Sequence, residues 1–167
     1  MRAVPTRGSV LPSKESGAGG ASDRRRSSTR RAIVALRSVP LFDGISRRHL
    51  RRLAGEGDVV SFGPGRPIVE EGQAGEAMFV VLGGTGRVER SGRRVGDVMP
   101  GDFFGELSAL DGGPRTASVV PETPMEVLRV YRHTLRRMVQ EEPGFGMGLL
   151  EGIARRLRQV MPGSPTP

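Results

Sequence analysis

The sequence contains no cysteine and no tryptophan, and only one tyrosine and two histidines among its 167 residues. Without cysteine there is no disulfide framework and no thiolate chemistry. The histidines, His49 and His133, lie far apart, and neither has another histidine at metal-ligand spacing, which argues against a metal site. No apolar run approaches the roughly 18 residues that a membrane span requires, and the N-terminal residues lack the apolar region of a signal peptide. We therefore expect a soluble, cytoplasmic protein without a metal or cofactor.

Basic charge is concentrated at the N-terminus. Residues 1–31 carry eight basic and two acidic side chains, a net charge of +6, whereas the remainder carries 18 basic and 16 acidic ones, a net charge of +2. The first segment is rich in Ser, Gly, Pro and Arg and lacks apolar periodicity, so we expect residues 1–31 to be disordered. The chain length fits one domain beside this tail. We place the domain at residues 32–162 and a second disordered end at residues 163–167.

The run RRRSSTRR at residues 24–31 has more than one interpretation. Such a basic cluster suits an anionic partner, for example nucleic acid or an acidic lipid surface. It also resembles a substrate site for basophilic protein kinases, with Ser27 or Ser28 as the acceptor, where a phosphate would cancel much of the local charge. The interpretation we favour is a solvated tail with neither role.

The stretch richest in chemistry is PGDFFGELSALDGGPRTAS, residues 100–118. Gly105 allows a ligand to approach the backbone closely, because it has no Cβ. The short helix predicted after it begins with backbone N–H groups that lack partners, which favours an anion. Arg115 adds a planar, permanently charged donor nine residues after Glu106. Donors for a phosphate beside a carboxylate acceptor for hydroxyls suit a sugar phosphate.

FGELSAL at residues 104–110, followed by GPRTAS at residues 113–118, resembles the phosphate-binding cassette of cyclic-nucleotide-binding domains. Such domains occur in the catabolite activator protein and in the regulatory subunits of cyclic-AMP-dependent protein kinase. The resemblance implies that Glu106 accepts a hydrogen bond from the ribose 2′-hydroxyl and that Arg115 pairs with the cyclic phosphate. Alternatively, these two side chains only pair with each other and hold the loop together. The ligand-binding residues that the resemblance implies are Phe104, Gly105, Glu106, Leu107, Ser108, Arg115, Thr116, Ala117 and Val88.

Short apolar segments separated by Gly and Pro predict a small antiparallel sandwich or barrel. The expected strands are Val59–Phe62, Pro67–Glu70, Met78–Leu82, Arg87–Arg90, Val95–Met99, Ala117–Val120 and Met125–Val130. Ser46 is the predicted N-cap of a helix over Arg47–Ala54. Together with the resemblance, this gives a mainly β fold with flanking helices, an antiparallel β-barrel or jelly roll. We expect N-terminal helices in residues 32–56, the barrel in 57–131 and C-terminal helices in 132–162.

The last helix is predicted to begin near Phe145 and to end before Pro162. The resemblance implies that it covers the base as a lid, and we name Ile153 and Leu157 as its contacts. Its interior glycines each cost about 1 kcal/mol relative to alanine, so we expect its first half to be marginal alone and ordered by ligand. Val80, Leu82 and Val88 are candidates for the apolar wall beside the base, with ordinary barrel core as the alternative for each.

The resemblance implies a receptor module for a 3′,5′-cyclic nucleotide, and no arrangement of residues suggests catalysis, so we do not expect an enzyme. We favour cyclic AMP over cyclic GMP because soluble bacterial members more often bind it, although Thr116 permits both. No helix-turn-helix pattern follows the last helix, which argues against direct DNA binding; we expect a separate effector protein, and a homodimer is compatible with the sequence. The rival hypotheses are a scaffold of the same fold without nucleotide and a protein that binds nucleic acid through its basic tail.

Overall fold

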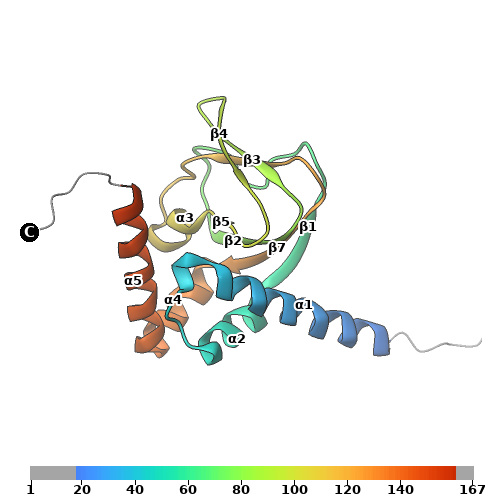
Figure 1. Ribbon diagram of the computed structural model, residues 1–167, viewed down its shortest axis with the longest axis vertical. Coiled ribbons are helices and arrows are strands. Elements are labelled where there is room, and N and C mark those ends of the chain that lie inside the picture. Colours follow the sequence, from blue (N-terminus) through green and yellow to red (C-terminus); the bar gives the residue numbers. More distant parts are fainter. Residues whose placement is uncertain (1–17, 161–167) are drawn as a thin grey trace, which may run out of the picture.

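The computed structural model describes residues 18–160, in which two antiparallel sheets are flanked by helices gathered on one side (Figure 1). One sheet has four strands and the other three. The spatial order in the four-stranded sheet is β1 (Asp58–Phe62), β7 (Met125–Tyr131), β2 (Ala77–Gly83) and β5 (Phe103–Phe104). The order in the three-stranded sheet is β4 (Arg93–Val98), β3 (Gly86–Arg90) and β6 (Ser118–Pro121). The predicted mainly β fold with flanking helices is confirmed. Its strands form two separate hydrogen-bonded sheets within the described residues.

Strand β2 is buried on both faces because two apolar clusters meet on it. Its alternating side chains divide between these clusters, as the two-residue period of a strand requires. Met78 and Val80 pack with the helices, whereas Phe79 and Val81 join a cluster between the two sheets. This explains why the β2 sequence is an almost continuous apolar run rather than an alternating one.

The helices are built around the first of these clusters. They are α1 (Ala18–Ser38), the 3₁₀ turn η1 (Pro40–Phe42), α2 (Arg47–Glu56), α3 (Glu106–Asp111), α4 (Arg132–Glu141) and α5 (Pro143–Val160). Ser46 caps α2 as predicted, since its hydroxyl accepts a hydrogen bond from the N–H of His49 at 3.3 Å. No helix within residues 18–160 is both long and apolar enough to cross a membrane.

The expected disorder of residues 1–31 is wrong for residues 18–31, because α1 begins at Ala18. The helix is rich in Ala and Arg, which favour helix, and its second half is anchored by the fully buried Ala32 and Leu36. Tertiary packing of this kind supplies most helical stability in proteins. Ser27 is exposed and Ser28 half-buried on α1. The rest of the predicted tail and the predicted end at residues 163–167 lie outside the described residues.

Three smaller features differ from the expectations. Residues 67–70 form no strand and pair only through a single bridge between Val69 and Val119, since Pro67 has no N–H to donate. Strand β5, two residues long, was not expected. Helix α5 begins at Pro143 rather than near Phe145, consistent with the preference of proline for the first turn of a helix.

Candidate functional site

A cavity of about 570 Å³ lies where residues 104–118, the cassette segment, meet the three-stranded sheet, η1 and α5. All nine residues that the sequence analysis named for ligand binding line this one cavity. Four valines from outside the cassette or from its neighbouring strands form part of its apolar wall: Val69, Val88, Val98 and Val119. The charged part comes from the cassette and from residues distant in sequence. The structure therefore brings the nine predicted residues together in one cavity, which further residues also line.

The cassette is shaped by glycines at its two turns. Gly105, with φ of 74°, ends β5 and begins α3, and Gly112, with φ of 79°, ends α3 by donating its N–H to the Ser108 carbonyl. Both glycines take the left-handed conformation that side chains disfavour. Glu106 consequently occupies the first turn of α3, where the helix dipole favours a carboxylate, and is only 6% exposed.

Arg115 is held in the cassette with only 7% of its surface exposed. Its Nη1 donates a hydrogen bond of 2.8 Å to the Gly105 carbonyl, and its Cζ lies 5.8 Å from the centroid of the Phe79 ring. Burial lowers the pKa of Arg115, while the carboxylates of Glu106 and Glu76 act in the opposite direction. The group stays charged, because the pKa of arginine begins far above neutrality.

The carboxylate of Glu106 attracts the guanidinium of Arg115 electrostatically, and this attraction agrees both with a ligand-binding pair and with a pair that only holds the loop together. Within the described residues, one N–H of the guanidinium donates a hydrogen bond to the backbone carbonyl of Gly105. One bond uses one of the five N–H donors of an arginine. The arrangement therefore leaves donor capacity at the cavity for an anionic group.

Two predicted wall residues are not at the cavity. Val80 is fully buried in the cluster between sheet and helices, and Leu82 packs against the same cluster. Their positions follow from the alternation of β2, which turns even-numbered residues toward the helices. Val88, the third candidate, does line the cavity.

The predicted lid contacts on α5 are also corrected. Ile153 packs against the helical core and Leu157 is 53% exposed, whereas Gly152 and Arg155 line the cavity. Gly152 and Arg155 are three residues apart and therefore share one helix face, which is the face of α5 that lies against the cavity. Arg155 is fixed there by a hydrogen bond of 2.6 Å from its Nη2 to the Asp43 carbonyl.

The glycines of α5 have a packing role that the sequence analysis missed. A Cβ at Gly152 would overlap the Leu41 carbonyl oxygen, and one at Gly148 would lie 2.8 Å from Cγ1 of Ile45. These two glycines are four residues apart and therefore lie on one face of the helix. Gly152 lets α5 approach the backbone of η1 closely, and Gly148 makes room for the side chain of Ile45, three residues after η1. Glycine lowers the helix propensity of α5 at these two positions, and in return it permits close packing against residues 41–45.

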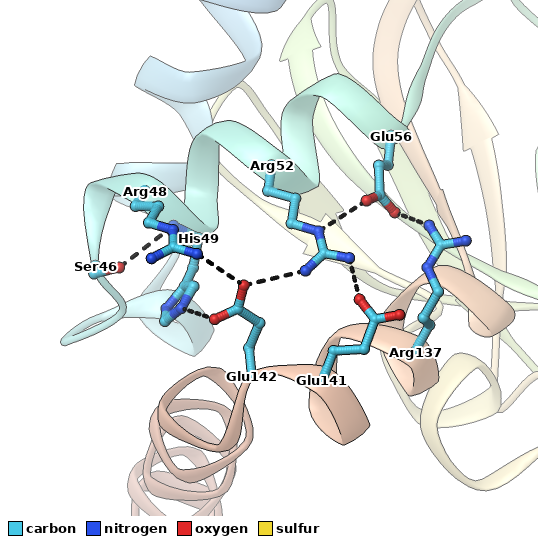
Figure 2. Close-up of polar contacts among 8 residues, drawn as sticks. All are labelled: Ser46, Arg48, His49, Arg52, Glu56, Arg137, Glu141 and Glu142. Atoms are coloured by element: carbon cyan, nitrogen blue, oxygen red, sulfur yellow. Dashed lines mark hydrogen bonds and ion pairs between the residues drawn. The ribbon is translucent and has the colours of Figure 1, made fainter.

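A polar network joins α2 to the junction between α4 and α5 (Figure 2). Arg52 pairs with Glu142 at 3.1 Å, with Glu56 at 3.0 Å and also with Glu141. His49 Nε2 lies 3.1 Å from the second carboxylate oxygen of Glu142. Because Glu142 immediately precedes Pro143, the network fixes the point at which the chain turns into α5.

This network predicts an acid-sensitive contribution to stability. The hydrogen bond with His49, followed by the charge of Arg48 and the hydrogen bond from Arg52, lowers the pKa of Glu142 below its ordinary 4.5. A carboxyl group with a lowered pKa stabilises the folded state above pH 4.5, and this contribution is lost as the pH falls through the lowered value. We expect the Tm of Glu142→Gln to change less than that of the unmodified protein between about pH 5 and about pH 3.

Thermal unfolding across this pH range measures the difference. Glu151→Gln is a matched control, because Glu151 is exposed on α5 and its only ion pair in the described residues is a 4.0 Å contact with Arg155. The control is expected to follow the unmodified protein. If the Tm of Glu142→Gln and the Tm of the unmodified protein fall equally over this pH range, Glu142 does not supply the acid-sensitive contribution.

Sequence and structure comparisons identify the family of this chain. Residues 59–142 match the model of the cyclic nucleotide-binding domain. The chain is 31% identical over 128 residues to the CRP-like cAMP-activated global transcriptional regulator of Mycobacterium tuberculosis, covering 72% of this chain and 56% of that protein. It is 32% identical over 133 residues to a cAMP-dependent protein kinase regulatory subunit of Aspergillus fumigatus, covering 78% of this chain and 30% of that protein.

Solved structures agree with this assignment. The N-terminal domain of a transcriptional regulator from Streptomyces coelicolor superposes with a TM-score of 0.69 at 30% identity, covering 78% of this chain and 96% of that one. The catabolite activator protein of Thermus thermophilus gives a TM-score of 0.64 at 31% identity, covering 72% of this chain and 59% of that one. The chain belongs to the cyclic nucleotide-binding domain family. It spans about half or less of the length of the two curated relatives named above.

Several cavity residues were not found from the sequence. Arg90, Asp97 and Arg155 line the cavity but lie outside the cassette, on β3, β4 and α5. No local pattern distinguishes them from the other charged residues of a chain that contains 26 basic and 18 acidic side chains. Only the packing of α5 and the three-stranded sheet around the cassette places them together.

Proposed function

We propose that this chain is a receptor module for a 3′,5′-cyclic nucleotide, with cyclic AMP favoured over cyclic GMP. The observation that carries the proposal is that Glu106 and Arg115 line one cavity beside the start of α3. A cyclic phosphodiester carries one negative charge. The guanidinium of Arg115 and the first N–H groups of α3 match that charge without a metal ion.

In this arrangement each part of the ligand has its own counterpart. The exocyclic phosphate oxygens meet Arg115 and the amides from Gly105 to Ser108 and of Thr116. The ribose 2′-hydroxyl donates to the Glu106 carboxylate. The base lies toward the apolar wall that includes Val88, with α5 beside it. Phe104, Leu107 and Ala117 complete the cavity wall around these groups.

The identity of the base is supported by the relatives rather than by one contact. The two curated relatives described above carry cAMP in their names. A cGMP-dependent protein kinase of Toxoplasma gondii is also 31% identical, over 62% of this chain. Thr116 permits both nucleotides. We favour cyclic AMP for this chain and propose a regulatory role, in which binding changes the position of α5 and signals to a separate protein.

Calorimetric titration with cyclic AMP and cyclic GMP tests the proposal. We expect binding at micromolar dissociation constants or tighter, with cyclic AMP preferred. Glu106→Gln keeps the shape of the side chain but removes its charge, so it should weaken binding by about tenfold to a hundredfold. The same variant should lose little affinity for 2′-deoxy cyclic AMP, which lacks the partner hydroxyl. Absence of heat with either nucleotide, together with an unchanged Tm, would support a scaffold without nucleotide.

A further inference from the structure

The guanidinium of Arg115 lies between two glycines that belong to different parts of the chain. A Cβ at Gly105 would overlap its Nη1, and a Cβ at Gly75 would overlap its Nε and Cζ. Gly105 is part of the cassette and has a left-handed backbone, with φ of 74°. Gly75 lies 30 residues earlier, in the loop that leads into β2, and does not line the cavity.

The need for glycine at residue 75 is steric rather than conformational. Gly75 is not among the described glycines with positive φ, so other residues can adopt its backbone conformation. What an added side chain meets is the middle of the guanidinium, together with Cβ of Ser108 at 2.8 Å. A contact with Nε and Cζ cannot be relieved by rotating only the end of the arginine. Substitution at Gly75 therefore acts on the position of Arg115.

The loop that contains Gly75 is tied to Arg115 and cannot easily move away from it. The N–H of Gly72 donates to the Arg115 carbonyl at 2.8 Å, and the N–H of Arg115 donates to the Gln73 carbonyl at 2.8 Å. Ala74 also forms a bridge with Pro114. Because these bonds hold loop and cassette together on the backbone side, a methyl group at residue 75 displaces the guanidinium or breaks them.

We infer that Gly75 is a positioning residue for Arg115, which it holds in the orientation that receives the cyclic phosphate. This inference rests on the proposed function, since the phosphate gives that orientation its purpose. Gly75 does not contact the ligand. Its effect on affinity is transmitted through Arg115, because displacing a planar donor by a fraction of an ångström weakens a geometry-dependent, charge-assisted pair.

A double-mutant cycle tests this inference. Gly75→Ala is made both in the unmodified protein and in the Arg115→Ala background, and cyclic nucleotide affinity and the Tm without ligand are measured for all four proteins. With Arg115 present we expect Gly75→Ala to lose about tenfold or more in affinity and to lower the Tm. In the Arg115→Ala background both losses should be much smaller, with only the contact to Ser108 remaining.

Two comparisons separate positioning from a general loosening of the cavity. Gly63→Ala is the matched control, because Gly63 lacks a positive φ and has no atom within 4 Å of the added Cβ. It should leave affinity and Tm unchanged. In addition, the ratio of affinities for cyclic AMP and cyclic GMP should be the same in Gly75→Ala as in the unmodified protein, since both ligands carry the same phosphate. A changed ratio would indicate a disturbed base site and would overturn the inference.

The outcomes for Gly75 and for the proposed function are distinguishable. If the unmodified protein binds no cyclic nucleotide, the proposed function fails, whereas the Tm cycle still tests the contact between Gly75 and Arg115. Equal losses from Gly75→Ala in both backgrounds would overturn the role of Gly75 and leave the receptor function standing. If Gly75→Ala leaves the affinity unchanged while Arg115 is present, the role of Gly75 is likewise overturned and the receptor function still stands.

Discussion

Replacing Arg115 with alanine is expected to weaken cyclic nucleotide binding by about 2–4 kcal/mol, or roughly thirtyfold to a thousandfold. The guanidinium is the cationic side chain within the cassette, and at 7% exposure its pair with a phosphate is largely shielded from water. Electrostatic interactions are stronger in such an environment than at the surface. Titration calorimetry with cyclic AMP measures the loss.

The companion variants make the result specific to Arg115. Arg115→Lys should also weaken binding, because an ammonium group does not reproduce the planar pair of donors. Arg66→Ala removes an exposed arginine that does not line the cavity, and it should bind as tightly as the unmodified protein. If Arg115→Ala also binds as tightly as the unmodified protein, the proposed phosphate site is wrong.

Replacing Phe145 with alanine is expected to lower the free energy of unfolding by about 3–5 kcal/mol. The side chain is completely buried in the helical core and lies edge-on to His49, with ring centroids 6.1 Å apart. It occupies the first turns of α5, directly after the junction fixed by Glu142. Its removal leaves a cavity at the point where α5 is anchored. Urea denaturation followed by circular dichroism measures the change.

Met147→Ala is the matched control for this prediction. Met147 lies two residues later on the same helix and is 58% exposed, so its truncation should change stability by no more than about 0.5 kcal/mol. Amide hydrogen exchange on α5 adds a local measurement. Phe145→Ala should lose protection on α5 more than on the sheets if Phe145 anchors the helix. Similar stabilities for the two variants would contradict that role.

The cassette could be predicted because its chemistry is contiguous in sequence. The turn glycine, the acidic first residue of the helix and the arginine all fall within residues 105–115, and local sequence determines a turn and a short helix directly. The antiparallel class of the sheets followed in the same way from short apolar segments separated by glycine and proline. Turns and strand segments of this kind depend on neighbours along the chain, whereas the pairing of the strands, for example β1 with β7, joins segments that are far apart in sequence.

The predictions that failed required knowledge of packing. Residues 18–31 have the composition of a tail, yet they continue a helix whose later residues are buried against the β-structure. As apolar residues, Val80 and Leu82 would suit either the wall of a cavity or the protein core. Which of the two they form depends on what packs against each face of β2. Neither distinction can be read from the chain itself, because it depends on what each side chain faces in the folded protein.

The sequence by itself determined the family, the mainly β class and the residues around Glu106 and Arg115, because local backbone preferences and one contiguous motif encode them. Tertiary structure alone decided what surrounds that motif. It brought Gly152 and Arg155 of α5 to the cavity and placed Gly75 against the guanidinium. It also tied the start of α5 to α2 through Glu142. The physical reason is that these contacts join segments far apart in the chain, whose spacing is set by close packing and not by sequence separation.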